Sequence, residues 1–287
     1  MAAPMPELAG VEHHYAVVNG FRMHYAEAGG GDPLILQHGW PQHWWMWRHQ
    51  IPVLAERYRL IVPDLRGYGW SEAPRDGYEK AQFARDVIAL MDELGIERVR
   101  YVGHDWGAVT GYHLGADHAE RFERLACLGA PPPWRKSPPP PDLIAITLLY
   151  QGLLSAPLLG GLAVRNGFAE VVMKAGRQLG EFSEDELRAY REPLMEPGHD
   201  NATVQTYRTA LTKELPTALR DGNRSMRVTV PLLVVLGAEE MFKKLLDPER
   251  IRAHADDVRI ELIDGSGHFM PEEAPDTVNE LLLEFLA

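Results

Sequence analysis

The sequence predicts an α/β fold, in which a mostly parallel, eight-stranded sheet is flanked by helices and an all-helical cap is inserted into the chain. Short apolar segments alternate with helical patterns in residues 1–131 and 223–287, as in a parallel sheet with helical crossovers. Residues 132–222 carry helical patterns alone, and the proline-rich segment PPPWRKSPPPP (131–141) marks the change. We therefore expect a core domain of residues 1–131 and 223–287 and a cap domain of residues 132–222.

Composition and charge narrow the class of protein. Of the 287 residues, 45% are hydrophobic, which is enough for a packed core, and the net charge of −12 disfavours nucleic acid and anionic membrane surfaces as partners. A small neutral substrate fits this charge better. The single cysteine, Cys127, lies in an apolar run, so the sequence offers neither a disulfide framework nor a cysteine-based metal site. The first residues contain no basic or apolar signal region, and we expect a cytoplasmic location.

The N-terminal part of the chain predicts a hairpin and then a strand–helix–strand unit. Residues 12–18 and 21–28 alternate apolar and polar side chains, and Asn19-Gly20 between them is a strong hairpin signal. The next three segments predict a buried strand, a helix and a second buried strand, namely PLILQHG (33–39), QHWWMWRHQIPVLAE (42–56) and YRLIVPDLRG (58–67). A strand–helix–strand unit implies parallel strands.

The same reasoning predicts the later elements. Apolar residues at helical spacing favour a helix over 78–95, which leads into a buried strand before Asp105. The charge-free stretch 143–164 is interrupted by Pro157 and by a glycine pair, so we expect two short helices and no membrane span. The other expected elements are helices at 106–118, 183–194, 203–215, 247–254 and 271–286, and strands at 124–130, 228–237 and 258–265.

Asp105 stands at the apex of a glycine-bracketed turn between a strand and a helix. The segment GHDWG (103–107) has the frame of a nucleophile elbow, whose two glycines let the strand and the helix approach closely. A carboxylate at the apex is already an anion at neutral pH, so it can attack carbon without a base and form an alkyl ester. The alternative is that Asp105 only caps the following helix. This stretch alone leaves both interpretations open.

A histidine and two carboxylates follow the last two predicted strands. His268 lies on a glycine-rich turn after the last strand, and we therefore expect it at the same edge of the sheet as Asp105. The chain order of nucleophile, acid and histidine predicts that His268 is a general base. Glu240, the third residue after Gly237, is the favoured partner for orienting the imidazole, with Glu239 as the alternative.

Two turns offer backbone N–H groups that could bind an oxyanion. The segment QHGWP (37–41) follows a predicted strand, and the N–H of Trp40 can pair there with the N–H of Trp106. The neighbouring loop PDLRGYGWS (63–71) is polar, and we expect Asp64 and Arg66 to brace it.

A family resemblance rests on four motifs in this order: HGWP (38–41), PDLRGYGWS (63–71), GHDWGA (103–108) and SGHFMPEE (266–273). Together they resemble the α/β-hydrolase superfamily, and GHDWG with HGWP is similar to its epoxide hydrolase branch. In that branch an aspartate opens the epoxide while two cap tyrosines hold and protonate the oxygen. The resemblance implies these roles for Tyr150 and Tyr207, with Tyr190 as a further candidate.

The resemblance implies a reaction as well as a fold. A small apolar epoxide and water would give a vicinal diol through a covalent ester on Asp105, and no metal or organic cofactor is called for. A glutamate at position 240 departs from the commoner aspartate, and its longer side chain would need a different approach to His268. We expect a monomer or a homodimer. The implied substrate-binding residues are His38, Trp40, Trp106, Tyr150 and Tyr207.

Other functions remain open at this point. A haloalkane dehalogenase would use the same aspartate and histidine, with two indoles, one of them from Trp106, binding the halide. A fluoroacetate-type dehalogenase fits less well, because position 106 is not arginine, and an esterase would need Ser or Cys in place of Asp105. A non-catalytic receptor for a small apolar ligand is the alternative from a different class.

Overall fold

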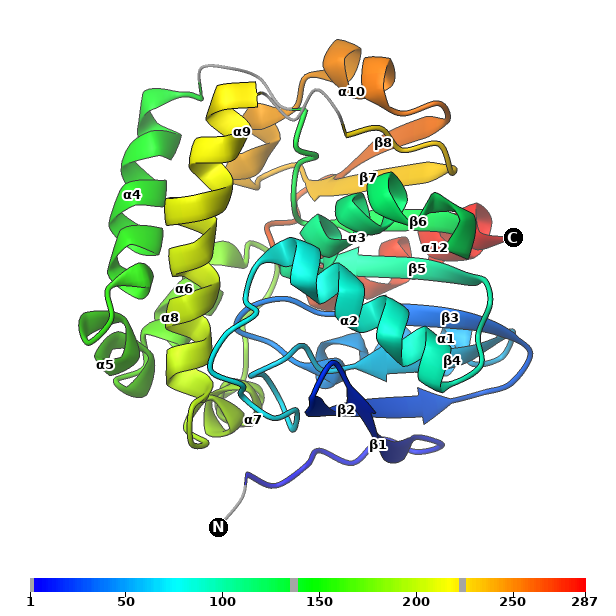
Figure 1. Cartoon of the computed structure of the whole chain (residues 1–287), viewed down its shortest axis with the longest axis horizontal. Helices are drawn as coiled ribbons and strands as arrows, with labels where there is room; N and C mark the ends of the chain where they lie inside the picture. Colours follow the sequence, from blue (N-terminus) through cyan, green and yellow to red (C-terminus); the bar gives the residue numbers. More distant parts are fainter. Residues whose placement is uncertain (1–2, 135–138, 222–225) are drawn as a thin grey trace.

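A computed structural model describes residues 3–134, 139–221 and 226–287 (Figure 1). Its centre is one eight-stranded sheet with the strand order β1-β2-β4-β3-β5-β6-β7-β8. The pairs β1·β2 and β2·β4 are antiparallel and all the others are parallel, which confirms the predicted fold class. The strands are β1 (Glu12–Val18), β2 (Phe21–Ala28), β3 (Asp32–Gln37), β4 (Tyr58–Pro63), β5 (Val99–His104), β6 (Phe122–Leu128), β7 (Leu232–Gly237) and β8 (Val258–Ile263).

Helices cover both faces of the sheet. Successive side chains of a strand point to opposite faces, so Leu34 and Leu36 join one hydrophobic cluster and Ile35 joins the other. The helices that pack on the sheet are α1 (Ile51–Leu54), α2 (Lys80–Glu93), α3 (Trp106–Asp117), α10 (Pro248–His254), α11 (Met270–Glu273) and α12 (Pro275–Leu286). Because these faces are both covered, the central strands are almost wholly buried.

The predicted hairpin is confirmed, since β1 and β2 pair from Glu12↔Glu27 to Val18↔Phe21. Its turn residues Asn19 and Gly20 have φ of 48° and 82°, and Asn-Gly is the pair that tolerates this left-handed backbone best. The hairpin thus forms the antiparallel edge of the sheet.

Two predicted helices are wrong in detail, because a proline breaks each of them. Residues 42–56 form a 3₁₀ turn (Trp44–Trp47) followed by α1, since Pro52 has no N–H to donate to the carbonyl of Arg48. Residues 271–286 are divided at Ala274 into α11 and α12, since Pro275 cannot donate either.

A second layer of helices lies beside the carboxyl ends of the parallel strands, at the left of Figure 1. It consists of α4 (Pro141–Ser155), α5 (Leu159–Arg165), α6 (Phe168–Gly176), α7 (Glu184–Leu194), α8 (His199–Thr209), a π-helical turn (Ala210–Glu214) and α9 (Leu215–Asp221). We refer to this layer as the cap helices. The predicted domain boundary between residues 222 and 223 lies outside the described residues.

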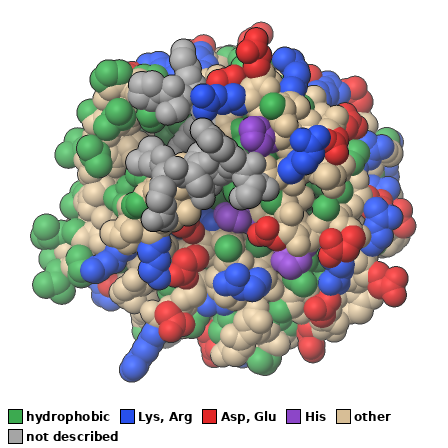
Figure 2. Space-filling view, turned by 45° about the horizontal axis from the view of Figure 1, so that its top comes forward, with side chains coloured by type: hydrophobic (Ala, Val, Ile, Leu, Met, Phe, Trp, Pro, Cys, Tyr) green, Lys and Arg blue, Asp and Glu red, His purple; other side chains and the backbone are tan. Residues whose placement is uncertain are grey.

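The outer face of α4 and α5 is apolar. Hydrophobic side chains gather at the left of Figure 2, over α4 and α5, and include the exposed Leu149 and Leu158. Among the described residues, no single helix has the length and apolar composition to cross a membrane; α4 and α5 reach that length only together, and they meet at an angle of 91°.

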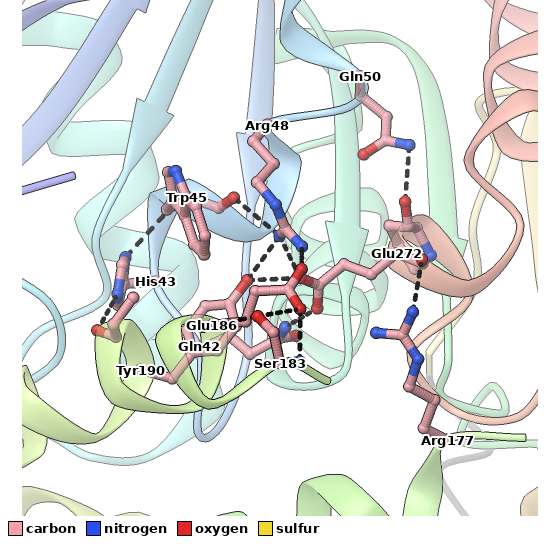
Figure 3. A network of polar contacts seen from close by, with 12 residues as sticks. Gln42, His43, Trp45, Arg48, Gln50, Arg177, Ser183, Glu186, Tyr190 and Glu272 are labelled. Atoms are coloured by element: carbon pink, nitrogen blue, oxygen red, sulfur yellow. Dashed lines mark hydrogen bonds and ion pairs between the residues drawn. The ribbon is translucent and has the colours of Figure 1, made fainter. Parts of the chain in front are cut away.

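A buried polar network ties α7 to the sheet domain (Figure 3). The guanidinium of Arg48 forms ion pairs with Glu186 at the start of α7 and with Glu272 of α11. Tyr190 of α7 donates a hydrogen bond of 2.7 Å from its hydroxyl to Glu272 Oε1. Three segments that are distant in sequence therefore meet at one carboxylate, which fixes the cap helices relative to the sheet.

Candidate active site

Asp105 lies at the carboxyl end of β5, in the sharp turn that leads into α3. Its backbone has φ 54° and ψ −115°, a conformation that non-glycine residues rarely adopt and that marks a strained position. A Cβ at Gly103 would collide with the carbonyl of Gly107, so this turn needs glycine there. The side chain of Asp105 accepts no capping hydrogen bond from α3, so the helix-cap interpretation is wrong. Because no capping bond to α3 holds it, the Asp105 carboxylate can face the edge of the sheet where the parallel strands end.

The two oxygens of this carboxylate have different surroundings. Oδ1 accepts a 2.8 Å hydrogen bond from the backbone N–H of Trp40. Burial raises the pKa of Asp105, while the charge of His268 and the N–H groups of Trp106 and Trp40 act in the opposite direction. A Cβ at Gly39 would collide with Oδ1, so glycine allows this close approach. The N–H of Trp40 therefore binds Oδ1, while Oδ2 faces His268.

His268 faces the second oxygen from the turn after β8. Its Nε2 lies 3.7 Å from Asp105 Oδ2, and its Nδ1 lies 2.7 Å from Glu240 Oε1. Burial alone would lower the pKa of His268, but the charges of Glu240 and Asp105 raise it to about 9. With both carboxylates ionised, the imidazole is therefore cationic at neutral pH.

Glu240, and not Glu239, reaches His268. Glu240 is 4% exposed and its Oε1 contacts the imidazole, whereas Glu239 is exposed and its backbone N–H donates to Ser266 O. Burial raises the pKa of Glu240, and the charge of His268 opposes that shift. A Cβ at Gly237 would collide with the backbone of the 266–267 turn, so glycine lets the end of β7 lie close to the turn that carries His268.

Tyr150 and Tyr207 meet above this site from α4 and α8. Their hydroxyls share a short hydrogen bond, and the Tyr207 ring packs against the Trp40 and Trp106 rings at centroid distances of 5.5 and 5.4 Å. Burial above all, and the Asp105 charge as well, raise the pKa of both phenols well above 10. Both hydroxyls therefore remain protonated and can donate. The third candidate, Tyr190, lies elsewhere, in the Arg48 network of Figure 3.

His38 contacts the backbone with both ring nitrogens. Its Nδ1 donates to Gly39 O at 2.9 Å, and its Nε2 accepts from the N–H of Leu65 at 2.9 Å. The ring thus joins two loops, and neither nitrogen is left to bind a substrate. The expected bracing role of Asp64 and Arg66 is confirmed, because they contact His24 at 2.7 Å and Asp86 at 2.6 Å, respectively.

Several residues around the site were not identified from the sequence. Trp40 Nε1 donates to Thr203 Oγ1 at 3.1 Å, and the hydroxyl of Tyr68 donates to Thr206 Oγ1 at 2.8 Å. Lys80 lies wholly buried against Trp106. Tyr68 belongs to the motif PDLRGYGWS (63–71), but the sequence pattern gave it no role. Thr203 and Thr206 lie within a helix and Lys80 begins one, and such positions do not indicate a functional site by themselves. In the described part of the chain, no three His, Cys, Asp or Glu side chains are grouped so as to hold a metal ion.

Comparisons with known proteins agree with this geometry. Residues 32–275 match the model of the α/β hydrolase fold family. The chain is 33% identical to the soluble epoxide hydrolase of Corynebacterium sp. strain C12, over 96% of this chain and 98% of that protein. It is 31% identical to epoxide hydrolase A of Mycobacterium tuberculosis, over 93% and 95% of the two chains.

A solved structure of an epoxide hydrolase is also similar to this chain. The ligand-free epoxide hydrolase CorEH superposes with a TM-score of 0.84 and 31% identity, covering 96% of this chain and 98% of that one. The resemblance inferred from the four motifs is confirmed. The chain belongs to the α/β-hydrolase family, in its epoxide hydrolase branch.

Proposed function

We propose that this protein hydrolyses epoxides to vicinal diols through a covalent ester on Asp105. The observation that carries the proposal is the pairing of the Tyr150 and Tyr207 hydroxyls over a site in which His268 faces Asp105. A ring oxygen leaves an epoxide as an alkoxide and needs donors, which two protonated phenols supply. The names of the related enzymes support the same reaction.

In the first step Asp105 attacks a ring carbon. Oδ1 is held by the Trp40 N–H, so Oδ2 is the nucleophile. The new Oδ2–C bond forms as the C–O bond of the ring breaks, and the electron pair goes to the ring oxygen, which receives a hydrogen bond and then a proton from Tyr150 or Tyr207. The product is a hydroxyalkyl ester of Asp105.

In the second step water cleaves the ester. Esterification removes the negative charge of Asp105, which is one of the charges that raise the pKa of His268, so that pKa falls. The imidazolium then gives up its proton, which returns through solvent to the tyrosinate formed in the first step, and the neutral imidazole can act as a base. His268 takes a proton from water, whose oxygen attacks Cγ, while the N–H groups of Trp40 and Trp106 stabilise the charge on Oδ1. The bond from Cγ to Oδ2 then breaks, Oδ2 takes the remaining hydrogen of the former water as the diol leaves, and the water oxygen stays in the restored Asp105 carboxylate.

The alternative functions find less support in the site. A haloalkane dehalogenase would need two indole N–H groups to bind the halide. Trp106 Nε1 has no hydrogen-bond partner among the described residues and could serve, but Trp40 Nε1 already donates to Thr203. A ligand receptor has no use for the His268–Glu240 pair. The cap role of residues 132–222, the oligomeric state and the cytoplasmic location stay predictions.

The experiment that tests the proposal is a turnover assay on terminal, aryl and disubstituted epoxides and on matched haloalkanes, with diol and halide measured separately. We expect diol without halide, and no diol from the Asp105→Ala variant, whose thermal unfolding should confirm that it folds. Halide without diol, or diol formation that survives Asp105→Ala, would overturn the proposal.

A further inference from the structure

Lys80 places a buried ammonium between the sheet domain and the cap helices. It is the first residue of α2, and its side chain is 1% exposed. Its Nζ donates to the backbone carbonyl of Thr206 at 2.8 Å and lies 4.4 Å from the centroid of the Trp106 ring. A buried ammonium is costly unless it is paired, and Glu214 Oε2 supplies the pair at 3.1 Å.

Glu214 holds Lys80 by two bonds. Its Oε1 accepts the backbone N–H of Lys80 at 2.7 Å, while its Oε2 pairs with Nζ of the same residue. One carboxylate from the cap helices therefore caps the N-terminus of α2, where a negative charge is favourable. Glu214 belongs to the π-helical turn Ala210–Glu214 that follows α8, and such turns often occur at functional sites.

Two of the contacts of the Lys80 ammonium, with Thr206 and with Trp106, lie next to residues of the candidate site. Thr206 directly precedes Tyr207 in α8, and Trp106 directly follows Asp105. We propose that Lys80 is a positioning residue, which holds the backbone of the Tyr207 helix against the Trp106 indole and so sets where the phenol lies relative to Asp105. This inference rests on the proposed function and deepens it.

The charge of Lys80 also acts on Asp105. Burial raises the pKa of Asp105, and the Lys80 charge is one of the influences that lower it. The other titratable groups that face Asp105 are His268, Glu240 behind it, and the phenols Tyr68, Tyr150 and Tyr207. Those that face Lys80 are Glu79, Glu214, Asp105 and His113.

The chain offers a matched control at the same interface. Lys213, beside Glu214, forms an ion pair with Glu79, beside Lys80, so the second pair joins the same two segments. Unlike the Lys80–Glu214 pair, the Lys213–Glu79 pair has an exposed lysine, since 64% of the Lys213 side chain is accessible to solvent. Lys213 Nζ donates to Glu79, and the contacts to Thr206 O and to the Trp106 ring belong to Lys80. Lys213→Met therefore removes a cross-interface ion pair without changing the contacts that define the proposal.

The test compares Lys80→Met with Lys213→Met. Methionine keeps the apolar stem and removes the charge and the donors. In single-turnover assays with an epoxide that the wild type opens, we expect Lys80→Met to slow the alkylation of Asp105 by ~10- to 100-fold, because a misplaced proton donor costs that much. The acidic limb of its pH–rate profile should move to higher pH, because Asp105 loses a nearby positive charge. Lys213→Met should match the wild type in both measurements.

Hydrogen–deuterium exchange of the peptide covering residues 199–215 gives a readout that needs no activity. We expect faster exchange in Lys80→Met and not in Lys213→Met. If Lys80→Met does not fold, Glu214→Gln takes its place, with the same direction of change in the alkylation rate and in exchange. Unchanged alkylation rate, pH profile and exchange in the variant, or equal losses in the Lys213 control, would overturn the proposal. A wild type that opens no epoxide would refute the proposed function, while exchange would still decide the role of Lys80.

Discussion

His268 Nε2 lies 3.7 Å from Asp105 Oδ2, although all the cap helices separate the two residues in sequence. At this distance the groups attract each other as charges without a hydrogen bond that would tie them together. A base that must take a proton from water beside the Asp105 carbonyl carbon has to be within reach of that atom and free to engage the water. The relationship between these two residues therefore carries the proposed second step.

The two cap phenols should be required for ring opening. Tyr150→Phe and Tyr207→Phe each remove one donor to the departing oxygen, and we expect each to lower the alkylation rate by ~100-fold, with a greater loss in the double variant. Stopped-flow fluorescence under single-turnover conditions measures this step. Tyr190→Phe is the control, because its hydroxyl bonds Glu272, and its rate should equal that of the wild type. Equal losses at all three positions would assign these tyrosines a packing role.

The choice between two adjacent glutamates can be tested directly. Glu240→Gln removes the charge that holds His268, so hydrolysis of the ester should slow by at least ~10-fold while alkylation remains rapid, and ester should accumulate in the steady state. Glu239→Gln alters an exposed side chain and should leave both rates unchanged. Quenching the reaction and measuring the ester fraction distinguishes the variants. An effect of Glu239→Gln alone would exchange the two assignments.

His268 predicts how stability depends on pH. Its folded-state pKa of about 9 exceeds the ordinary 6.5, so the folded protein binds this proton more tightly than the unfolded chain does. The resulting stabilisation is complete below pH 6.5 and is lost as the pH rises through 9, by up to about 3 kcal/mol in the free energy of unfolding. Urea unfolding across this range measures the slope. His268→Gln should lack this contribution, and an unchanged slope in the variant would refute it.

The Arg48 network should make a large contribution to stability. Arg48→Met leaves the fully buried carboxylate of Glu272 without its cation, which should cost ~3–5 kcal/mol. Arg188→Met, which removes an exposed ion pair with Asp185 on the same helix layer, should cost under ~1 kcal/mol. Chemical unfolding of both variants gives the comparison. Similar losses would mean that the buried pair is not a strong link between α7 and the sheet domain.

The sheet and much of the candidate site could be predicted from the sequence because both follow from local rules. Parallel strands bring their carboxyl ends to one edge, which places Asp105 and His268 together before any distance is known. The turn after β7 then brings one of two glutamates to His268, and spacing from Gly237 favours Glu240. The phenols came from the family resemblance and not from helical periodicity.

Other features could not be predicted because their partners come from distant segments. Nothing near Lys80 in sequence indicates that Thr206, Glu214 and Trp106 surround its ammonium. The helix expected at 42–56 is broken in part because the N–H of Trp44 bonds Asp64, a residue of the next strand's loop. Local propensity carries no information about such tertiary contacts.

Intact-mass spectrometry of the His268→Gln variant with excess epoxide tests the central claim most directly. Glutamine keeps the site polar but cannot take the proton from water, so ring opening should proceed and the ester should persist. We predict a mass increase equal to the mass of the epoxide, located on Asp105 by peptide mapping and absent from the His268→Gln/Asp105→Ala double variant. A variant that folds and stays unmodified, while the wild type turns over the same epoxide, would contradict the covalent two-step account.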